Sequence, residues 1–216
     1  MALQKTTIIA KVRSYINEYV TTADDFSAET DALLVSHIEA SARMTVQDVP
    51  LQYLAQQSQT PQPESVQRPD GRYYLRFDLP DDLVRFGSIV CGSLKRPIVT
   101  LLPKQHPSYA QQYSVTAGIG AGEWRPMGFQ HGKEVEIHSI SDGETAGSAE
   151  LTLNYVATPR FNGESLSVLD DRLLDIVALR AAALYLGLTG DAHAQAANEA
   201  AQTLITNITT AQDANN

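Results

Sequence analysis

The densest group of potential ligands in the sequence lies between residues 131 and 138. His131, Glu134, Glu136 and His138 follow one another there. Alternate residues of a β-strand share one face, so Glu134, Glu136 and His138 would point the same way and could form a weak divalent-metal site. Their spacing matches no compact zinc motif, and a solvated strand face needs alternating polar residues in any case. The sequence therefore predicts a solvated strand face and no metal site.

No other group of residues has the spacing of a known phosphate-binding or catalytic motif. Gly118 to Gly122 resembles part of a phosphate-binding loop, but no Lys-Ser/Thr pair and no helix follows it. A hydrolase site could assemble from His106, His131, His138 and Asp142, because catalytic groups need to meet only in space. That hypothesis stays open as an alternative. We predict no catalytic, cofactor-binding or metal-binding residues and expect that the protein is not an enzyme.

Four further residues receive structural interpretations. Cys91, the only cysteine, falls in a predicted strand and is expected to be a buried thiol. Asp170 and Asp171 would point about 100° apart on a helix, so helix capping explains them better than a shared proton does. Trp124, the only tryptophan, is expected to be buried over a sheet, with an interface anchor as the alternative.

Composition limits the classes of partner. The chain of 216 residues is long enough for a sizeable core, and it carries a net charge of −9. Direct nucleic-acid binding is disfavoured because phosphate contacts need clustered Lys and Arg. The small basic groups, Lys95 with Arg96 and Arg68 with Arg72, are interpreted as solvated surface. No apolar run approaches the roughly 20 residues of a membrane span, and we expect no membrane partner.

Helical periodicity dominates both ends of the chain. Apolar residues recur at helical spacing over 6–20 and from Ser27 to Ala42, and a short third helix is predicted over 49–55. Near the C-terminus the pattern predicts a helix that begins after Ser167 as its N-cap, a glycine turn, and a second helix capped by Asp191. The second helix has an expected packing stripe with flanking residues, namely Ala192, Ala196, Ala200, Leu204 and Ile208, flanked by Ala197, Ala201 and Ile205.

The middle of the chain alternates with a period of two. Strands are predicted over 73–79, 88–94, 97–102 and 149–156, with a hairpin over 129–140 that turns at His131-Gly132 and a glycine-rich loop over 141–147. A short helical turn is expected over 80–86, and a short helix or loop over 106–113. The stretch 56–71, rich in Gln, Ser and Pro, is predicted to be a linker or long loop.

These elements predict an α+β fold with an N-terminal helical hairpin, a central mixed or antiparallel β-region and a C-terminal antiparallel helix hairpin. We expect one domain over 1–216, divided into N-terminal helices (6–55), linker (56–71), β-region (72–158), helix pair (166–208) and flexible tail (209–216).

Two parts of the chain resemble a known family. The segment Tyr73-Tyr-Leu-Arg-Phe-Asp-Leu-Pro-Asp-Asp-Leu-Val-Arg-Phe-Gly-Ser-Ile-Val, with Lys95-Arg-Pro-Ile98 after it, is similar to the signature of neck and tail-adaptor ring proteins. These head-to-tail connector proteins belong to short-tailed double-stranded-DNA bacteriophages, particularly the crAss-like group. The C-terminal helix pair and the opening helix pair over 7–45 resemble the helices of the same adaptors.

The resemblance implies a structural virion protein. It implies a homo-oligomeric ring of about twelve copies that docks on the portal protein or on a neighbouring neck or tail ring. DNA would pass through the channel without sequence-specific binding, and an acidic wall would repel it. The expected location is the tail or neck of the virion, assembled in the host cytoplasm. The alternatives are a small-ligand or carbohydrate-binding β-module and a hydrolase with a site not visible in the sequence.

Overall fold

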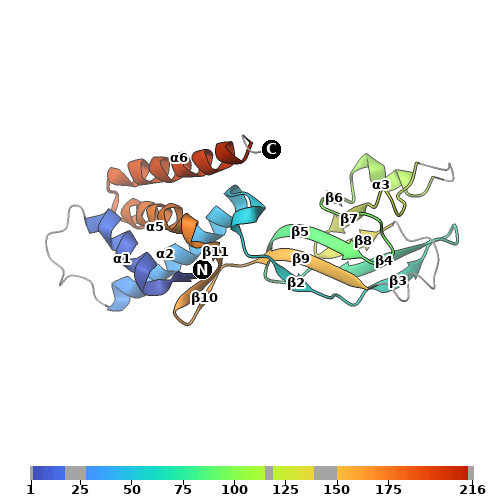
Figure 1. The fold of residues 1–216 in the computed structure, drawn as a ribbon, viewed down its shortest axis with the longest axis horizontal. Helices are drawn as coiled ribbons and strands as arrows, with labels where there is room; N and C mark the ends of the chain where they lie inside the picture. The colour runs from blue at the N-terminus through green and yellow to red at the C-terminus, as the bar shows by residue number, and fades with distance from the viewer. Residues whose placement is uncertain (1, 18–27, 115–118, 139–149, 214–216) are drawn as a thin grey trace. The chain divides into compact units, whose positions relative to one another are not determined.

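The computed structural model describes residues 2–17, 28–114, 119–138 and 150–213. The chain divides into two compact units, where the sequence analysis expected one domain. The helical unit comprises Met1–Ala55 and Thr158–Asn216, and the β unit comprises Gln56–Ala157. Helices and sheets occur together, as Figure 1 shows, so the predicted α+β class is confirmed.

Four helices form most of the helical unit: α1 (Lys5–Asn17), α2 (Ala28–Asp48), α5 (Leu174–Thr189) and α6 (His193–Asp213). The other three helices all pack against α5. Apolar residues at three- and four-residue steps form the core that they share, including Ile8, Val12, Ile16, Leu34, Ile38, Ala42, Ile176, Val177 and Ala181. The helical periodicity of both chain ends therefore predicted this core correctly.

One buried charge lies within this core. Arg180 of α5 is almost fully buried, and its guanidinium pairs with Asp48, the last residue of α2. The pair places a cation beside the negative end of the α2 dipole, which favours the α2–α5 contact.

The first C-terminal helix begins later than predicted. Ser165–Asp170 is strand β11, the central strand of a small antiparallel sheet with β1 (Ala2–Gln4) and β10 (Phe161–Asn162). Ser167 is therefore wrong as an N-cap. The N-cap role falls to Asp170, whose Oδ1 accepts a hydrogen bond of 2.9 Å from the backbone N–H of Arg172 at the start of a 3-10 turn, Asp171–Leu173. Capping thus explains Asp170, as expected.

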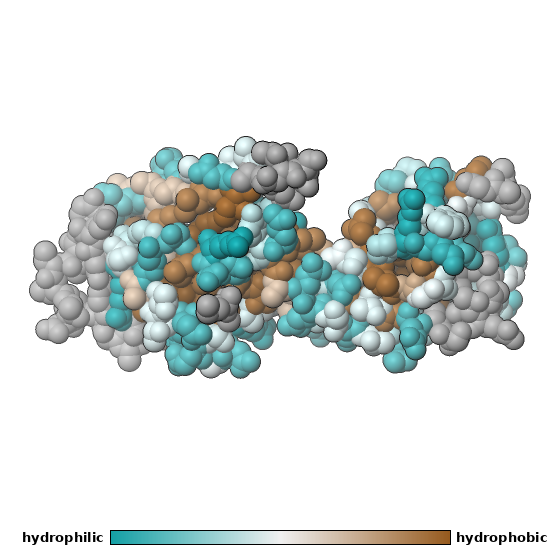
Figure 2. All heavy atoms as spheres, viewed as in Figure 1, coloured by the Kyte–Doolittle hydropathy of each residue, from teal (hydrophilic) through white to brown (hydrophobic). Residues whose placement is uncertain are grey.

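Helix α6 packs on a different stripe from the one predicted. Gly190 ends α5 with φ 70°, and the chain turns so that α6 runs back along α5 (Figure 1). Ala200, on the predicted stripe, is exposed, whereas its neighbour Ala201 and Ile205 are buried. Both stripes have a spacing of four and contain alanine, so composition could not choose between them. In the view of Figure 2, hydrophobic side chains gather on the helical unit just beneath α6.

The predicted flexible tail over 209–216 is wrong in part. Helix α6 continues to Asp213, and 214–216 lie outside the described residues. Within the described part of the chain, none of the helices combines the length and the hydropathy that a membrane span requires.

The β unit contains two sheets. The larger has the strand order β3-β4-β8-β7-β6, and the smaller has the order β2-β9-β5. All neighbours are antiparallel except β6 and β7, which are parallel, so the unit is mixed. The strands are β2 (Gln57–Gln59), β3 (Glu64–Gln67), β4 (Tyr73–Asp78), β5 (Leu83–Cys91), β6 (Leu101–Pro103), β7 (Gly128–His131), β8 (Glu134–Ile137) and β9 (Leu151–Ala157).

Two predictions for the β unit are wrong. The stretch 56–71 is not a simple linker, because it forms the edge strands β2 and β3. Their side chains are mostly exposed, so they lack the alternation that marks a half-buried strand. The segment 80–86 is not helical either. Pro80 accepts a turn hydrogen bond of 3.2 Å from the N–H of Leu83, where strand β5 begins.

Other predictions for the β unit are confirmed. The hairpin β7–β8 turns at His131 and Gly132, which has φ 62°. The short helix α3 (Pro107–Gln111) is present, and Leu151, Leu153 and Tyr155 of β9 are all buried. The predicted loop over 141–147 lies outside the described residues.

Candidate functional site

Glu136 and His138 form a buried pair, contrary to the prediction of a solvated strand face. Glu136 is 4% exposed, and its Oε2 lies 3.0 Å from Nε2 of His138. Strand β8 is the central strand of the larger sheet, and side chains from α3 cover this face of it. Glu134, two residues earlier, stays partly exposed, with Oε2 at 3.7 Å from Arg76.

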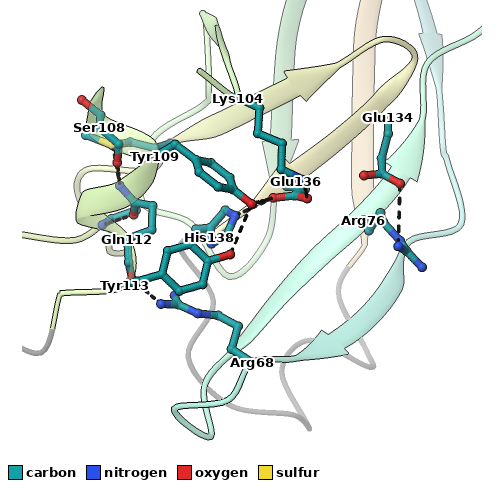
Figure 3. Close-up of polar contacts among 12 residues, drawn as sticks. Arg68, Arg76, Lys104, Ser108, Tyr109, Gln112, Tyr113, Glu134, Glu136 and His138 are labelled. Atoms are coloured by element: carbon teal, nitrogen blue, oxygen red, sulfur yellow. Dashed lines mark hydrogen bonds and ion pairs between the residues drawn. The ribbon is translucent and has the colours of Figure 1, made fainter. Parts of the chain in front are cut away.

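The Glu136 carboxylate accepts hydrogen bonds from two further side chains, as Figure 3 shows. Lys104 Nζ, just beyond β6, lies 2.7 Å from Oε1, and the Tyr109 hydroxyl of α3 lies 2.9 Å from Oε2. Two ionic or charge-assisted contacts and one neutral donor thus surround one buried carboxylate. We call Lys104, Tyr109, Glu136 and His138 the Glu136 cluster.

The cluster keeps its carboxylate ionised. Burial by itself would raise the pKa of Glu136, but the hydrogen bonds from His138, Lys104 and Tyr109 outweigh it and lower that pKa to about 2. Burial, together with hydrogen bonds to Tyr113 and Glu136, raises the pKa of Tyr109. The hydrogen bond to Glu136 raises the pKa of Lys104. The cluster is therefore a carboxylate held by an ammonium group and a neutral phenol.

Aromatic rings enclose the imidazole of His138. Tyr74 stacks on it at 4.9 Å between ring centroids, and the rings of Tyr109, Tyr113 and Phe129 meet it edge-on at 5.5, 6.0 and 5.6 Å. With a proton on Nε2, the pair has the arrangement of a carboxylate–imidazole dyad with Nδ1 as the base. The His138 side chain has 0% exposure, however, so a substrate cannot reach Nδ1 in this arrangement. The geometry fits a structural polar core.

The remaining histidines of the hydrolase hypothesis do not join the cluster. His106 caps α3, because its Nδ1 accepts a hydrogen bond of 3.2 Å from the backbone N–H of Ser108. His131 is exposed at the end of β7, and Asp142 lies outside the described residues. Among the described residues, no three His, Cys, Asp or Glu side chains are grouped to hold a metal ion. Cys91 is buried, as expected, with Sγ 2.9 Å from the Ser93 hydroxyl.

Trp124 is not buried over a sheet as expected, because 67% of it is exposed. It lies in a tight turn closed by two backbone hydrogen bonds between Gly122 and Arg125, of 3.3 and 3.0 Å. The N–H of Lys95 donates to the carbonyl of Glu123 at 2.9 Å, which joins this turn to the loop after β5. The turn therefore presents the indole to solvent from a fixed backbone.

A hollow of about 310 Å³ lies beside this turn. Its lining is largely apolar and includes Pro97, Val99, Trp124 and Met127, with Arg96 and Arg125 contributing as well. Val99 is 65% exposed. The β unit thus has an exposed aromatic side chain, an exposed aliphatic side chain and two guanidinium groups in one place.

The helical unit has an apolar groove of its own. It has a volume of about 360 Å³ and lies between α6 and the start of α5, with lining residues Tyr53, Arg172, Asp175, Ile176, Leu204, Asn207 and Ile208. We call it the α6 groove. Leu204 and Ile208 were predicted to pack against the first C-terminal helix, but they are only half-buried and leave this groove open.

Sequence reasoning found two members of the Glu136 cluster and missed the others. The spacing of Glu136 and His138 indicated that they share a face. Tyr109 and Tyr113 lie four apart within the short segment predicted over 106–113. If that segment is helical, they share a face, but the sequence does not show what that face contacts. No sequence pattern identified Lys104 as a partner of Glu136, because the parallel pairing of β6 with β7 is what brings Lys104 close to β8.

A comparison of the sequence with models of known protein families gives no match, and a comparison with curated proteins gives no significant match. The two surfaces and the Glu136 cluster are therefore interpreted from their own geometry.

Proposed function

We propose that this protein is a structural virion protein, a subunit of the head-to-tail connector or neck adaptor ring of a short-tailed bacteriophage. In this role, about a dozen copies would join the portal to the tail and form part of the DNA channel. The proposal starts from the resemblance of the opening helices, the Tyr73 to Ile98 segment and the C-terminal helix pair to such adaptors.

One structural observation carries the proposal: α6 leaves apolar surface open beside it. Helix α6 packs mainly on α5, and only Ala201 and Ile205 are buried among its residues with described burial. The α6 groove beside it retains half-buried Leu204 and Ile208. Apolar surface that the chain does not cover itself favours contact with another protein subunit.

The polar groups of the chain agree with a structural role. Aromatic rings enclose His138 of the Glu136 cluster, and the hydrogen bond from Tyr109 to Glu136 joins α3 to the larger sheet. The net charge of −9 would repel DNA from a channel wall and let it slide.

The test is the mass of the purified protein by light scattering across a concentration series, with negative-stain images of any large species. We expect a closed ring of about a dozen subunits. A monomer at all concentrations that binds a small ligand or carbohydrate in the α6 groove would contradict the proposal and favour a binding module.

A further inference from the structure

Eight basic side chains of the β unit divide by their contacts with carboxylates. Most face a carboxylate: Arg68 and Arg72 pair with Asp70, Arg76 with Glu64, Lys104 with Glu136, and Lys133 with Asp81. By contrast, Lys95, Arg96 and Arg125 have no carboxylate partner among the described residues.

Arg96 and Arg125 line the hollow beside the exposed indole, and Lys95 precedes Arg96 in the chain. The backbone bond from Lys95 to Glu123 joins the loop that carries Lys95 and Arg96 to the turn that carries Trp124 and Arg125. We call Lys95, Arg96, Val99, Trp124 and Arg125 the Trp124 patch. Glu123 is the one carboxylate in its turn, so the patch has an excess of positive charge on a chain that is acidic as a whole.

We propose that the Trp124 patch docks on an acidic surface of a second copy of this chain. An exposed tryptophan on a fixed turn, with arginines at its sides, is the composition that dominates binding energy at protein interfaces. The partner must supply carboxylates. The chain has 25 acidic and 16 basic residues, and the excess of acidic residues is larger still once the three patch cations are set aside.

The charge of the patch also fixes the symmetry of the contact. Two patches facing each other across a two-fold axis would place cations opposite cations, which is unfavourable. The patch must therefore meet a different surface of the neighbour. Such a head-to-tail contact generates a closed ring or an open filament. The inference rests on the proposed function, since the ring supplies the neighbouring copy.

The experiment follows assembly with Trp124 itself, which is the only tryptophan. Light scattering gives the mass across a concentration series, while the emission maximum and acrylamide quenching of the indole are recorded on the same samples. We expect the emission to shift to the blue and quenching to fall as the mass rises. Added salt should weaken the assembly.

Two variants and one control locate the contact. Trp124→Ala and the double variant Arg96→Glu/Arg125→Glu should each raise the concentration needed for half-assembly at least about tenfold. The matched control is the double variant Arg43→Glu/Arg160→Glu, which makes the same charge change at two exposed arginines of the helical unit. It should leave assembly unchanged. Circular dichroism checks that every variant is folded.

The outcomes separate this inference from the proposed function. If the wild-type chain forms rings and the patch variants form them equally well, the patch inference is overturned while the ring proposal stands. A wild-type chain that stays monomeric throughout counts against both. Quenching of Trp124 by a single-stranded oligonucleotide, with no change in protein mass, would overturn the second copy as occupant and assign the patch to nucleic acid.

Discussion

Glu136 shows how a single residue can conflict with its local sequence pattern. Its strand reads Glu-Val-Glu-Ile, an alternation that normally places glutamates in water. Here, Lys104, Tyr109 and His138 take the place of water around the carboxylate. A buried carboxylate that loses such partners is strongly destabilising, so the cluster should matter for the stability of the β unit.

The change Glu136→Gln should therefore remove a pH-dependent part of the stability. The pKa of Glu136 falls from 4.5 to about 2 on folding. Because the folded value lies below the unfolded one, the stabilisation is fully present above the unfolded pKa and is lost as pH falls towards the folded one. A difference of this size corresponds to about 3 kcal/mol in the free energy of unfolding.

Urea unfolding of wild type and variant at about pH 7 and about pH 2.5 checks this prediction. The difference between the two proteins should be largest at the higher pH and shrink on acidification. Glu134→Gln is the control, since Glu134 is partly exposed and its pair with Arg76 should contribute less than about 1 kcal/mol. A pH-independent cost for Glu136→Gln would show that the charge of the carboxylate is not what matters.

At the scale of secondary-structure elements, hydrophobic periodicity predicted the helices. It missed the strands whose formation depends on tertiary packing and not on a local pattern. Ile8, Ile38 and Val177 lie on clear helical faces, and all three are in the core. Strands β2 and β3 escaped prediction because an edge strand with little burial has no hydrophobic pattern to display. Strand β11 alternates Ser165, Leu166, Ser167 and Val168, a signal that the adjoining helix pattern concealed.

The register of α6 can be tested directly, because adjacent alanines differ in their environment. Ala201 is fully buried, whereas Ala200, on the stripe predicted from the sequence, is exposed. Ala201→Asp should place a carboxylate against α5 and destabilise the docking of α6 by about 2–4 kcal/mol. Ala200→Asp has the same helix propensity cost without that burial.

Hydrogen exchange of the α6 amides measures the effect. Ala201→Asp should accelerate exchange along α6 while leaving α1 and α2 protected, and Ala200→Asp should have a much smaller effect. Equal acceleration by both variants would contradict the register of α6 seen in the structure.

The last turn of α6 offers a test of assembly at the same scale. Residues after Ile208 extend the helix beyond the α6 groove, which ends at that residue. A chain truncated after Ile208 should keep its fold, because Ala201 and Ile205 still anchor the helix. If the chain forms the proposed ring, the truncated chain should dock more weakly on a neighbouring protein. Circular dichroism checks that the fold is kept, and light scattering measures the assembly. Unchanged assembly would count against a role for this segment.

On the scale of the whole molecule, the chain's two ends build one unit and its middle builds the other. The two ends of the β unit are neighbours, because Gln57 of β2 pairs with Tyr155 of β9. The first and last strands of the β unit are paired, which is the geometry of a domain inserted into the sequence of another domain. Helical periodicity at both ends of the sequence indicated a shared core, but pairing between strands so far apart in the sequence could not be read from local patterns.

This arrangement predicts that the helical unit folds without the β unit. Replacing Gln56–Ala157 with a flexible linker of about four residues should preserve it, because the paired strand ends imply a short gap to bridge. The core formed by α1, α2 and α5 remains complete in such a chain.

Far-UV circular dichroism of the shortened chain should show a helical spectrum, and its urea unfolding should be cooperative. Ile38→Asp in the same shortened chain is the control that should abolish the transition, since Ile38 is fully buried in the core. A shortened chain without cooperative unfolding would mean that the helical unit depends on the β unit for its stability.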